Sequence, residues 1–220
     1  MPYLPPCDLL MQWLDTRPCN SDGRLVMRYD DVIDVLKAFV GAIPVDEAWY
    51  LSEYPAVADL VRSVRTETAA SHFRAHGYLE GRRPFADGWN GYAEPVSFDR
   101  LKPQLRLTPT RGGLTAFMTR DEFIALIKQL LTAVPVDAEW YGRQYPICRI
   151  GFDTSGRSSH FVEVGYFNGW LPADVAVDAE WYQGRYEHVR RGLELGLALD
   201  AKDHFLKMGY REGCRPIPPS

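Results

Sequence analysis

The sequence has few cysteines, and none of them are paired at the spacing that a zinc site requires. Cys7, Cys19, Cys148 and Cys214 are far apart and form no C-x-x-C pair, which argues against a zinc site. We therefore expect buried or idle free thiols, with a Cys7–Cys19 disulfide as the alternative, and we assign no metal and no cofactor.

Long apolar runs and basic runs are also missing. No stretch approaches the roughly 18 apolar residues that span a bilayer, and the N-terminus has neither a basic leader nor a continuous apolar core. We therefore expect no membrane span, no signal peptide and a cytoplasmic location. The net charge is −4 and the basic residues are interspersed with acidic ones, which argues against a nucleic-acid partner.

The short motifs that identify common enzymes are absent as well. The chain has no phosphate-binding G-x-x-x-x-G-K-[ST] loop, no G-x-S-x-G elbow, no H-E-x-x-H and no dinucleotide-binding glycine pattern after a strand. We assign no catalytic residues, and the enzyme families that these motifs mark are excluded.

The most informative feature that is present is an internal repeat rich in Trp and Tyr. A Val-Asp-x-x-Trp-Tyr segment is followed by a Tyr, then by His-Phe, Gly-Tyr, Gly and Pro. The His and the closing Pro are twelve residues apart in all three copies, whereas the Trp and the His are separated by 23, 20 and 23 residues. The expected structural positions of the repeat are Trp49, Tyr50, His72, Trp140, Tyr141, His160, Trp181, Tyr182 and His204.

Apolar residues at helical spacing precede two of the copies. Residues 32–40 carry them at i, i+1, i+3, i+4, i+7 and i+8, and residues 123–131 repeat the pattern 91 positions later. Thr119 and Glu122 have the spacing of a capping box at the start of the second helix. Pro44 and Pro135 follow the two helices at the same point.

These patterns predict an all-α, mainly helical fold with two long copies of the module and a shorter third. We divide the chain into an N-terminal extension (1–22), a first repeat half (23–84), a linker (85–117), a second half (118–172), a third module (173–216) and a tail (217–220). The linker contains a candidate hairpin around Arg111-Gly112-Gly113.

Each module should contain two short helices. Asp46, Asp137 and Asp178 are suited to cap the helix that carries the Trp-Tyr pair. We expect the second helix to run through the His and to end at Gly77, Gly165 or Gly209, each acting as a left-handed C-cap. The Trp rings should form the core of the module, and the His should hold the Trp-Tyr helix through a hydrogen bond.

The module resembles a bacterial repeat found in surface, secreted and polysaccharide-biosynthesis proteins, including glycosyltransferase-associated chains. The first copy matches best, through Trp49-Tyr50, Tyr54-Pro55-Ala56-Val57, His72-Phe73, Gly77 and Glu80-Gly81-Arg82-Arg83-Pro84. The third copy keeps Glu212-Gly213-Cys214-Arg215-Pro216, and the second departs further, with Asn168-Gly169-Trp170-Leu171-Pro172. The resemblance implies a carbohydrate or cell-envelope context and no particular reaction.

We expect this chain to be a non-enzymatic protein-interaction or assembly module, because stacked modules create grooves and extended faces. A carbohydrate-binding protein that uses aromatic platforms is the alternative, and an enzyme of unrecognised type is the third reading. A protein partner is expected, and a homo-oligomer is left open. The candidate binding residues are those that the repeat does not require: Trp89, Tyr92, Trp170, Arg82 and Arg83.

Overall fold

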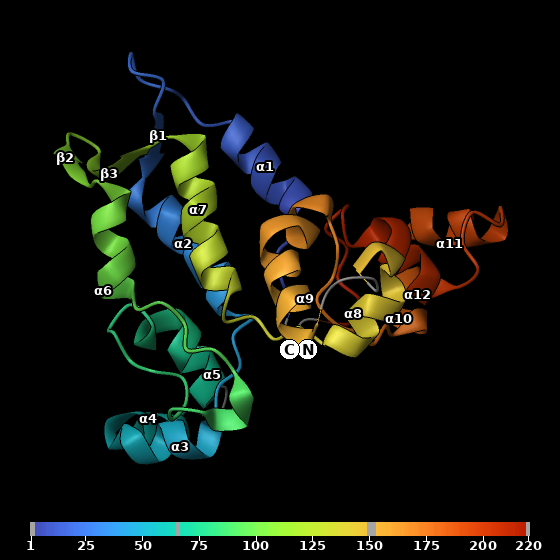
Figure 1. The fold of residues 1–220 in the computed structure, drawn as a ribbon, viewed down its shortest axis with the longest axis horizontal. Helices are drawn as coiled ribbons and strands as arrows, with labels where there is room; N and C mark the ends of the chain where they lie inside the picture. The colour runs from blue at the N-terminus through green and yellow to red at the C-terminus, as the bar shows by residue number, and fades with distance from the viewer. Residues whose placement is uncertain (1–2, 65–66, 149–152, 219–220) are drawn as a thin grey trace. The chain divides into compact units, whose positions relative to one another are not determined.

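The computed structural model describes residues 3–64, 67–148 and 153–218. Within these residues the chain is mostly helical, as predicted, with one small three-stranded sheet (Figure 1). It divides into two compact units. One comprises Leu14–Pro135, and the other comprises Tyr3–Trp13 together with residues 136–218. None of the helices in the described part of the chain is long and apolar enough to cross a bilayer.

The sheet belongs to the Leu14–Pro135 unit and has the order β1-β3-β2, with both pairs antiparallel. The predicted hairpin is present as β2 (Thr108–Thr110) and β3 (Gly113–Met118). The sequence did not predict that β3 also pairs with β1 (Leu25–Arg28), in the register Leu25↔Met118. Strand β1 is four residues long, so its partner could be identified only from the folded chain.

Two amphipathic helices, α2 (Tyr29–Val40) and α7 (Arg120–Leu131), pack together beside this sheet (Figure 1). The capping box predicted for α7 is present: the Thr119 hydroxyl accepts from the Glu122 N–H, and the Glu122 carboxylate accepts from the Thr119 N–H. The unit also contains η2 (Trp89–Gly91), α6 (Phe98–Leu101) and η3 (Lys102–Leu105). The apolar faces of α2 and α7 are buried through Val32, Ile33, Leu36, Phe39, Val40, Phe123, Leu126, Ile127, Leu130 and Leu131.

Three short helices carry the Trp-Tyr pairs: α3 (Glu47–Glu53), α8 (Ala138–Gln144) and α10 (Ala179–Arg185). As predicted, Asp46, Asp137 and Asp178 cap them, because each side chain accepts a hydrogen bond from the N–H of the following Trp. The backbone N–H groups of the same aspartates donate to the carbonyls of Pro84, Pro172 and Pro216, each at 3.0 Å. We call each stretch that carries the Trp-Tyr…His-Phe…Pro pattern a segment. This backbone bond joins the first helix of each segment to its closing proline.

The middle of each segment differs. It is α4 (Pro55–Ser63) in the first, η4 (Pro146–Cys148) in the second and α11 (Glu187–Glu194) in the third. The next helix is α5 (Ala69–His72), α9 (Thr154–His160) or α12 (Ala201–His204). Each continues as one π-helical turn: η1 (Phe73–Gly77), η5 (Phe161–Gly165) or η7 (Phe205–Gly209), and η6 (Tyr166–Asn168) follows η5.

The predicted left-handed cap at Gly77, Gly165 and Gly209 is wrong. These glycines are helical, and a Cβ on any of them would overlap the hydroxyl oxygen of Tyr50, Tyr141 or Tyr182. Their role is therefore to admit a close approach by the tyrosine. A left-handed glycine comes four positions later in each segment, at Gly81, Gly169 and Gly213, with φ of 75°, 74° and 80°.

The N-terminal segment, whose structure the sequence left unassigned, forms α1 (Cys7–Asp15). Within its own unit, the Pro5 carbonyl accepts hydrogen bonds from the hydroxyls of Tyr166 and Tyr210, at 3.0 and 3.4 Å. Arg211 makes two hydrogen bonds to the Asp8 carboxylate, at 3.0 and 2.9 Å. These contacts fasten the start of the chain onto residues 136–218.

Candidate functional site

A tyrosine–histidine pair lies at the centre of each segment, and it is buried in the first and third. The hydroxyls of Tyr50, Tyr141 and Tyr182 lie 3.2, 3.1 and 3.1 Å from Nδ1 of His72, His160 and His204. This is the hydrogen bond expected for the histidine, although its partner is the Tyr of the Trp-Tyr pair. The three Tyr side chains are fully buried, whereas the three Trp rings are only half-buried.

Burial favours the neutral forms of the first and third pairs. It raises the pKa of Tyr50 and Tyr182 above the ordinary range and lowers the pKa of His72 and His204. A neutral imidazole and a neutral phenol can form one hydrogen bond, in which one group donates and the other accepts, and neither group then carries a buried charge. The pair is therefore suited to holding two helices together, and it recurs in segments that differ elsewhere.

The residue ten positions after each His lies next to this pair, and its chemistry differs between the segments. In the first segment the Arg82 guanidinium lies over the Tyr54 ring, at 4.8 Å, and pairs with Glu80 at 2.8 Å. In the second segment the Trp170 ring stacks on Tyr145, with centroids 4.3 Å apart and an angle of 5°. In the third segment the equivalent residue is the much smaller Cys214.

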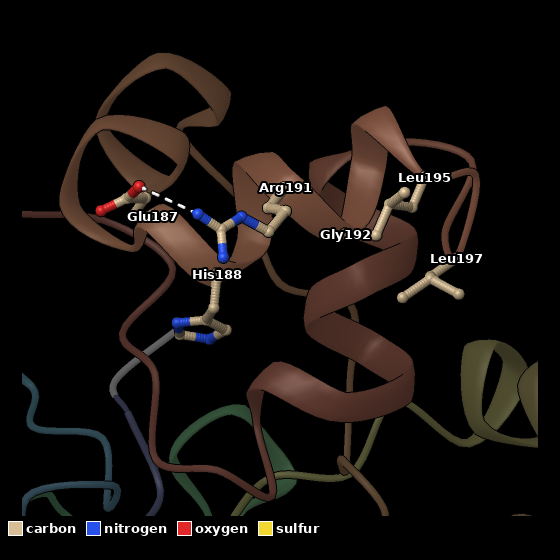
Figure 2. Close-up of a pocket in the computed structure, with 6 residues that line it drawn as sticks. All are labelled: Glu187, His188, Arg191, Gly192, Leu195 and Leu197. Carbon is tan, nitrogen blue, oxygen red and sulfur yellow. Dashed lines mark ion pairs between the residues drawn. The ribbon is translucent and has the colours of Figure 1, made fainter.

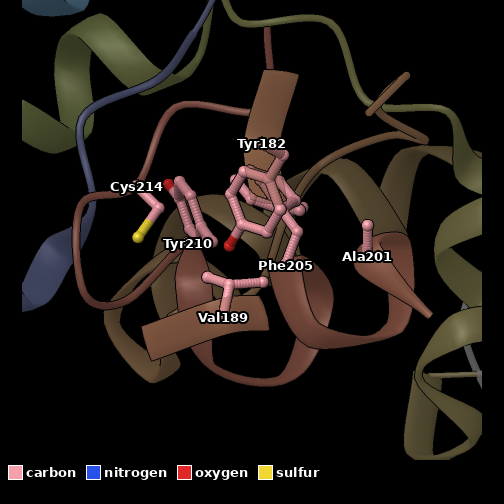
Figure 3. Close-up of a cluster of buried hydrophobic side chains, with 7 residues drawn as sticks. Tyr182, Val189, Ala201, Phe205, Tyr210 and Cys214 are labelled. Atoms are coloured by element: carbon pink, nitrogen blue, oxygen red, sulfur yellow. The ribbon is translucent and has the colours of Figure 1, made fainter. Parts of the chain in front are cut away.

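Cys214 lies at the edge of the buried cluster of the third segment (Figure 3). Its Sγ atom is 4.0 Å from Nε2 of His188, and that nitrogen is 3.3 Å from the Glu212 carboxylate. Donor atoms of His188, His204 and Glu212 all lie within 4.8 Å of one another. The third segment thus gathers two imidazoles, a carboxylate and a thiol in one place.

A pocket of about 380 Å³ adjoins His188 on α11. Figure 2 shows Leu195 and Leu197 on one side of it, and the Glu187–Arg191 ion pair on the other. Both leucines belong to the short segment Leu195-Gly196-Leu197-Ala198-Leu199 between α11 and α12, which we call the leucine segment. Its three leucines are 69%, 63% and 90% exposed, so the segment presents apolar surface directly to solvent.

The sequence did not identify the leucine segment or His188 as functional candidates. The available signal was the alternation of Leu with small residues between two predicted helices, in the part of the repeat where the spacing varies. The first segment has polar residues at the same distance from its Trp: Ser63, Arg65 and Glu67 stand where the third has Leu195, Leu197 and Leu199.

The candidate binding aromatics pack against other rings. Trp89 stacks on Phe85, with centroids 5.3 Å apart, and meets Tyr92 edge-on at 5.5 Å. Trp170, in addition to stacking on Tyr145, lies against His160 at 5.7 Å. Trp89, Tyr92 and Trp170 all remain half-buried, so part of each ring is accessible.

The two candidate arginines are engaged with acidic groups. Arg82 pairs with Glu80, as described above. Arg83 forms ion pairs with Asp87 and, at 2.6 Å, with Glu94. Each guanidinium is therefore neutralised locally, and the two do not make a free basic surface.

No protein-family model, curated protein or solved structure matches this chain. The functional argument therefore depends on the residues and their geometry.

Proposed function

We propose that this chain is a non-enzymatic protein-interaction module that binds a protein partner through the leucine segment. The observation that carries the proposal is the exposure of Leu195, Leu197 and Leu199 beside the pocket on α11. Fully burying one leucine side chain stabilises a complex by about 1.5–3 kcal/mol. Three adjacent exposed leucines can therefore supply the centre of an interface, and charged residues at the pocket margin can supply its polar rim.

The surroundings of the leucine segment favour a protein over a lipid surface. Glu187, Glu194 and Asp203 beside it are ion-paired with Arg191, Arg190 and Lys207, so the flanking helices have no net positive charge that would attract an anionic membrane. The segment also lacks the Trp and Tyr residues that anchor chains at membrane interfaces. A partner with an apolar segment, including a second copy of this chain, fits the pocket and the leucines.

We further propose that the three segments are copies of one module, and that the third has acquired the binding function. The recurring Asp cap, Tyr–His bond and closing Pro bond support this reading. If it is correct, the first copy indicates which residues the module tolerates without an interface. The substitutions Leu195→Ser, Leu197→Arg and Leu199→Glu transfer the residues of the first copy to the third.

This triple variant tests the proposal. We expect it to retain the melting temperature of the wild type, because all three side chains face solvent, and to lose partner binding. Self-association measured by sedimentation velocity tests a second copy as the partner, and chemical cross-linking in the expressing cells tests other proteins. Leu114→Ser, at another exposed leucine, is the matched control. Equal cross-linking and self-association of the wild type and the triple variant would contradict the proposal.

Carbohydrate binding at Trp89 and Tyr92 is the second candidate function. It is favoured by the partial exposure of both rings on a turn that contains Gly88 and Gly91 with positive φ. It also agrees with the polysaccharide and cell-envelope context that the resemblance implies. A glycan panel tests it: binding by the wild type that is lost in Trp89→Ala would support this function, and the absence of any glycan signal would reject it.

A further inference from the structure

We propose that His188, His204, Glu212 and Cys214 form a binding site for one Zn²⁺ ion in the third module. The four side chains come from α11, α12 and the turn before the closing proline. They offer two nitrogens, one oxygen and one sulfur, which are the donor types that zinc takes in proteins. The site is independent of the partner proposed above.

Three of the four proposed ligands already lie close together. Ligand atoms around a tetrahedral zinc lie roughly 3.3–3.8 Å apart, given metal–ligand bonds of about 2.0–2.3 Å. His188 Nε2 is already 3.3 Å from the Glu212 carboxylate and 4.0 Å from Cys214 Sγ. The donor atoms of His188, His204 and Glu212 lie within 4.8 Å of one another, so side-chain rotations can bring these three together. Cys214 lies outside that group, with its Sγ 4.0 Å from His188 Nε2, so its side chain must rotate further to reach the ion.

Burial divides the four ligands into two kinds. His204 and Cys214 are 3% and 4% exposed, and the Tyr182 hydroxyl contacts Nδ1 of His204 and so orients its ring. The side chains of His188 and Glu212 are 57% and 49% exposed, so the ion can enter from solvent and be covered by them.

The first segment has an arginine beside the carboxylate where the third segment has Cys214. Glu80 is paired with Arg82 at 2.8 Å, and the positions equivalent to these two are Glu212 and Cys214. The third segment therefore keeps the carboxylate and loses its arginine. It also has His188 at the position where the first segment has Ala56. Neither the cysteine nor His188 is required for the module to fold, because the other segments do without both.

The charges balance when zinc binds. The Cys214 thiol releases its proton to solvent as the sulfur–zinc bond forms, which leaves one thiolate and one carboxylate with two neutral imidazoles. The two negative charges compensate the Zn²⁺ ion, so the half-buried site carries no net charge. With four protein ligands the coordination is complete, as in structural zinc sites. The ion would tie α11 to α12 and to the closing turn.

The test uses the full chain, reduced and stripped of metal, and titrates it with Co²⁺ and then with Zn²⁺. We expect one equivalent of Co²⁺ to bind with visible d–d bands of tetrahedral coordination and a near-ultraviolet thiolate-to-cobalt band, and Zn²⁺ to displace it with a Kd below about 1 µM. Cys214→Ser should lose the thiolate band. His188→Ala should bind at least tenfold more weakly and, like Ala56 in the first segment, leave the metal-free melting curve unchanged.

Two controls separate this site from adventitious binding. Cys19→Ser removes another free cysteine, which is exposed, and His76→Ala removes an exposed histidine outside the cluster. Both should bind Co²⁺ as the wild type does. A wild-type Zn²⁺ Kd above about 1 µM would overturn the proposal. So would a cobalt spectrum that survives in both Cys214→Ser and His188→Ala, or one that is lost in Cys19→Ser.

Discussion

Replacing Gly209 by Ala tests the close approach between the π-helical turn and the buried tyrosine. A Cβ at this position would overlap the Tyr182 hydroxyl oxygen and lie 3.2 Å from Cζ of the same ring and 3.3 Å from Nδ1 of His204. Nonbonded heavy atoms rest about 3.5–4.0 Å apart. The tyrosine or the turn must therefore move by more than a side-chain rotation can provide, because the Tyr182 ring is fully buried.

Two opposing effects set the change in the free energy of unfolding of Gly209→Ala: overpacking lowers it, and the higher helix propensity of Ala raises it by a smaller amount. Overpacking a well-packed core costs about 1–3 kcal/mol, occasionally more, and Ala is favoured over Gly in a helix interior by about 1 kcal/mol. We expect Gly209→Ala to lower the free energy of unfolding by about 2 kcal/mol. Tyr182→Phe alone should cost about 1–2 kcal/mol, because the His204 nitrogen loses its buried hydrogen bond.

The double variant decides whether the overlap is the cause. Removing the hydroxyl leaves only the contacts at 3.2 and 3.3 Å, which need shifts of a few tenths of an ångström. Gly209→Ala should therefore cost at least about 1 kcal/mol less when it is combined with Tyr182→Phe than in the wild type. Urea denaturation followed by far-ultraviolet circular dichroism, with a chelator present, measures all four proteins.

Gly184→Ala is the matched control, since Gly184 lies in the same helix as Tyr182 and a Cβ there meets nothing within 4 Å. It should be neutral or stabilising by up to about 1 kcal/mol. Additive effects of Gly209→Ala and Tyr182→Phe would refute the reasoning, as would an equal effect of alanine at both glycines.

Three further predictions concern other positions. Thr119→Ala should lower the free energy of unfolding by about 1 kcal/mol in urea denaturation, because the Glu122 N–H loses its cap. Burial lowers the pKa of His72, so the unfolded chain binds more protons than the folded one as the pH falls below the ordinary histidine pKa of about 6.5. The stability contributed by the neutral His72 should therefore be complete above that pH and decrease below it. His72→Gln should weaken this dependence of the urea denaturation midpoint on pH. Trp181→Ala should cost about 1–3 kcal/mol in urea rather than the roughly 3–5 kcal/mol of a core ring, because Trp181 packs against the core cluster while only half-buried.

Local features were predictable because their causes lie within a few residues of one another. The Asp caps, the Thr119–Glu122 box and the hairpin between residues 108 and 118 are set by side chains and turns that the sequence places side by side. The apolar faces of α2 and α7 were likewise visible as a helical period. The partner of the recurring histidine was harder to assign: His72 was expected to hold the Trp-Tyr helix, and the atom that it contacts is the Tyr50 hydroxyl.

The candidate site could not be read in the same way, because its parts are distant in the sequence. His188 and Cys214 are 26 positions apart, and no regular spacing marks them as neighbours. The role of Gly209 also depends on Tyr182, which reaches it from another helix. The sequence pattern of glycine followed by tyrosine is compatible with a left-handed cap, and only the tertiary contact shows that the glycine is helical and crowded.

The sequence by itself determined the helical class, the caps and the recurrence of a Trp, Tyr and His pattern, since each depends on short-range periodicity and side-chain chemistry. Tertiary structure alone decided that β1 completes the sheet, that the tyrosines rather than the tryptophans are fully buried, and that three leucines stay in solvent. It also brought two histidines, a glutamate and a cysteine together. The physical reason is that burial and proximity between distant residues depend on how helices pack, which periodicity does not specify.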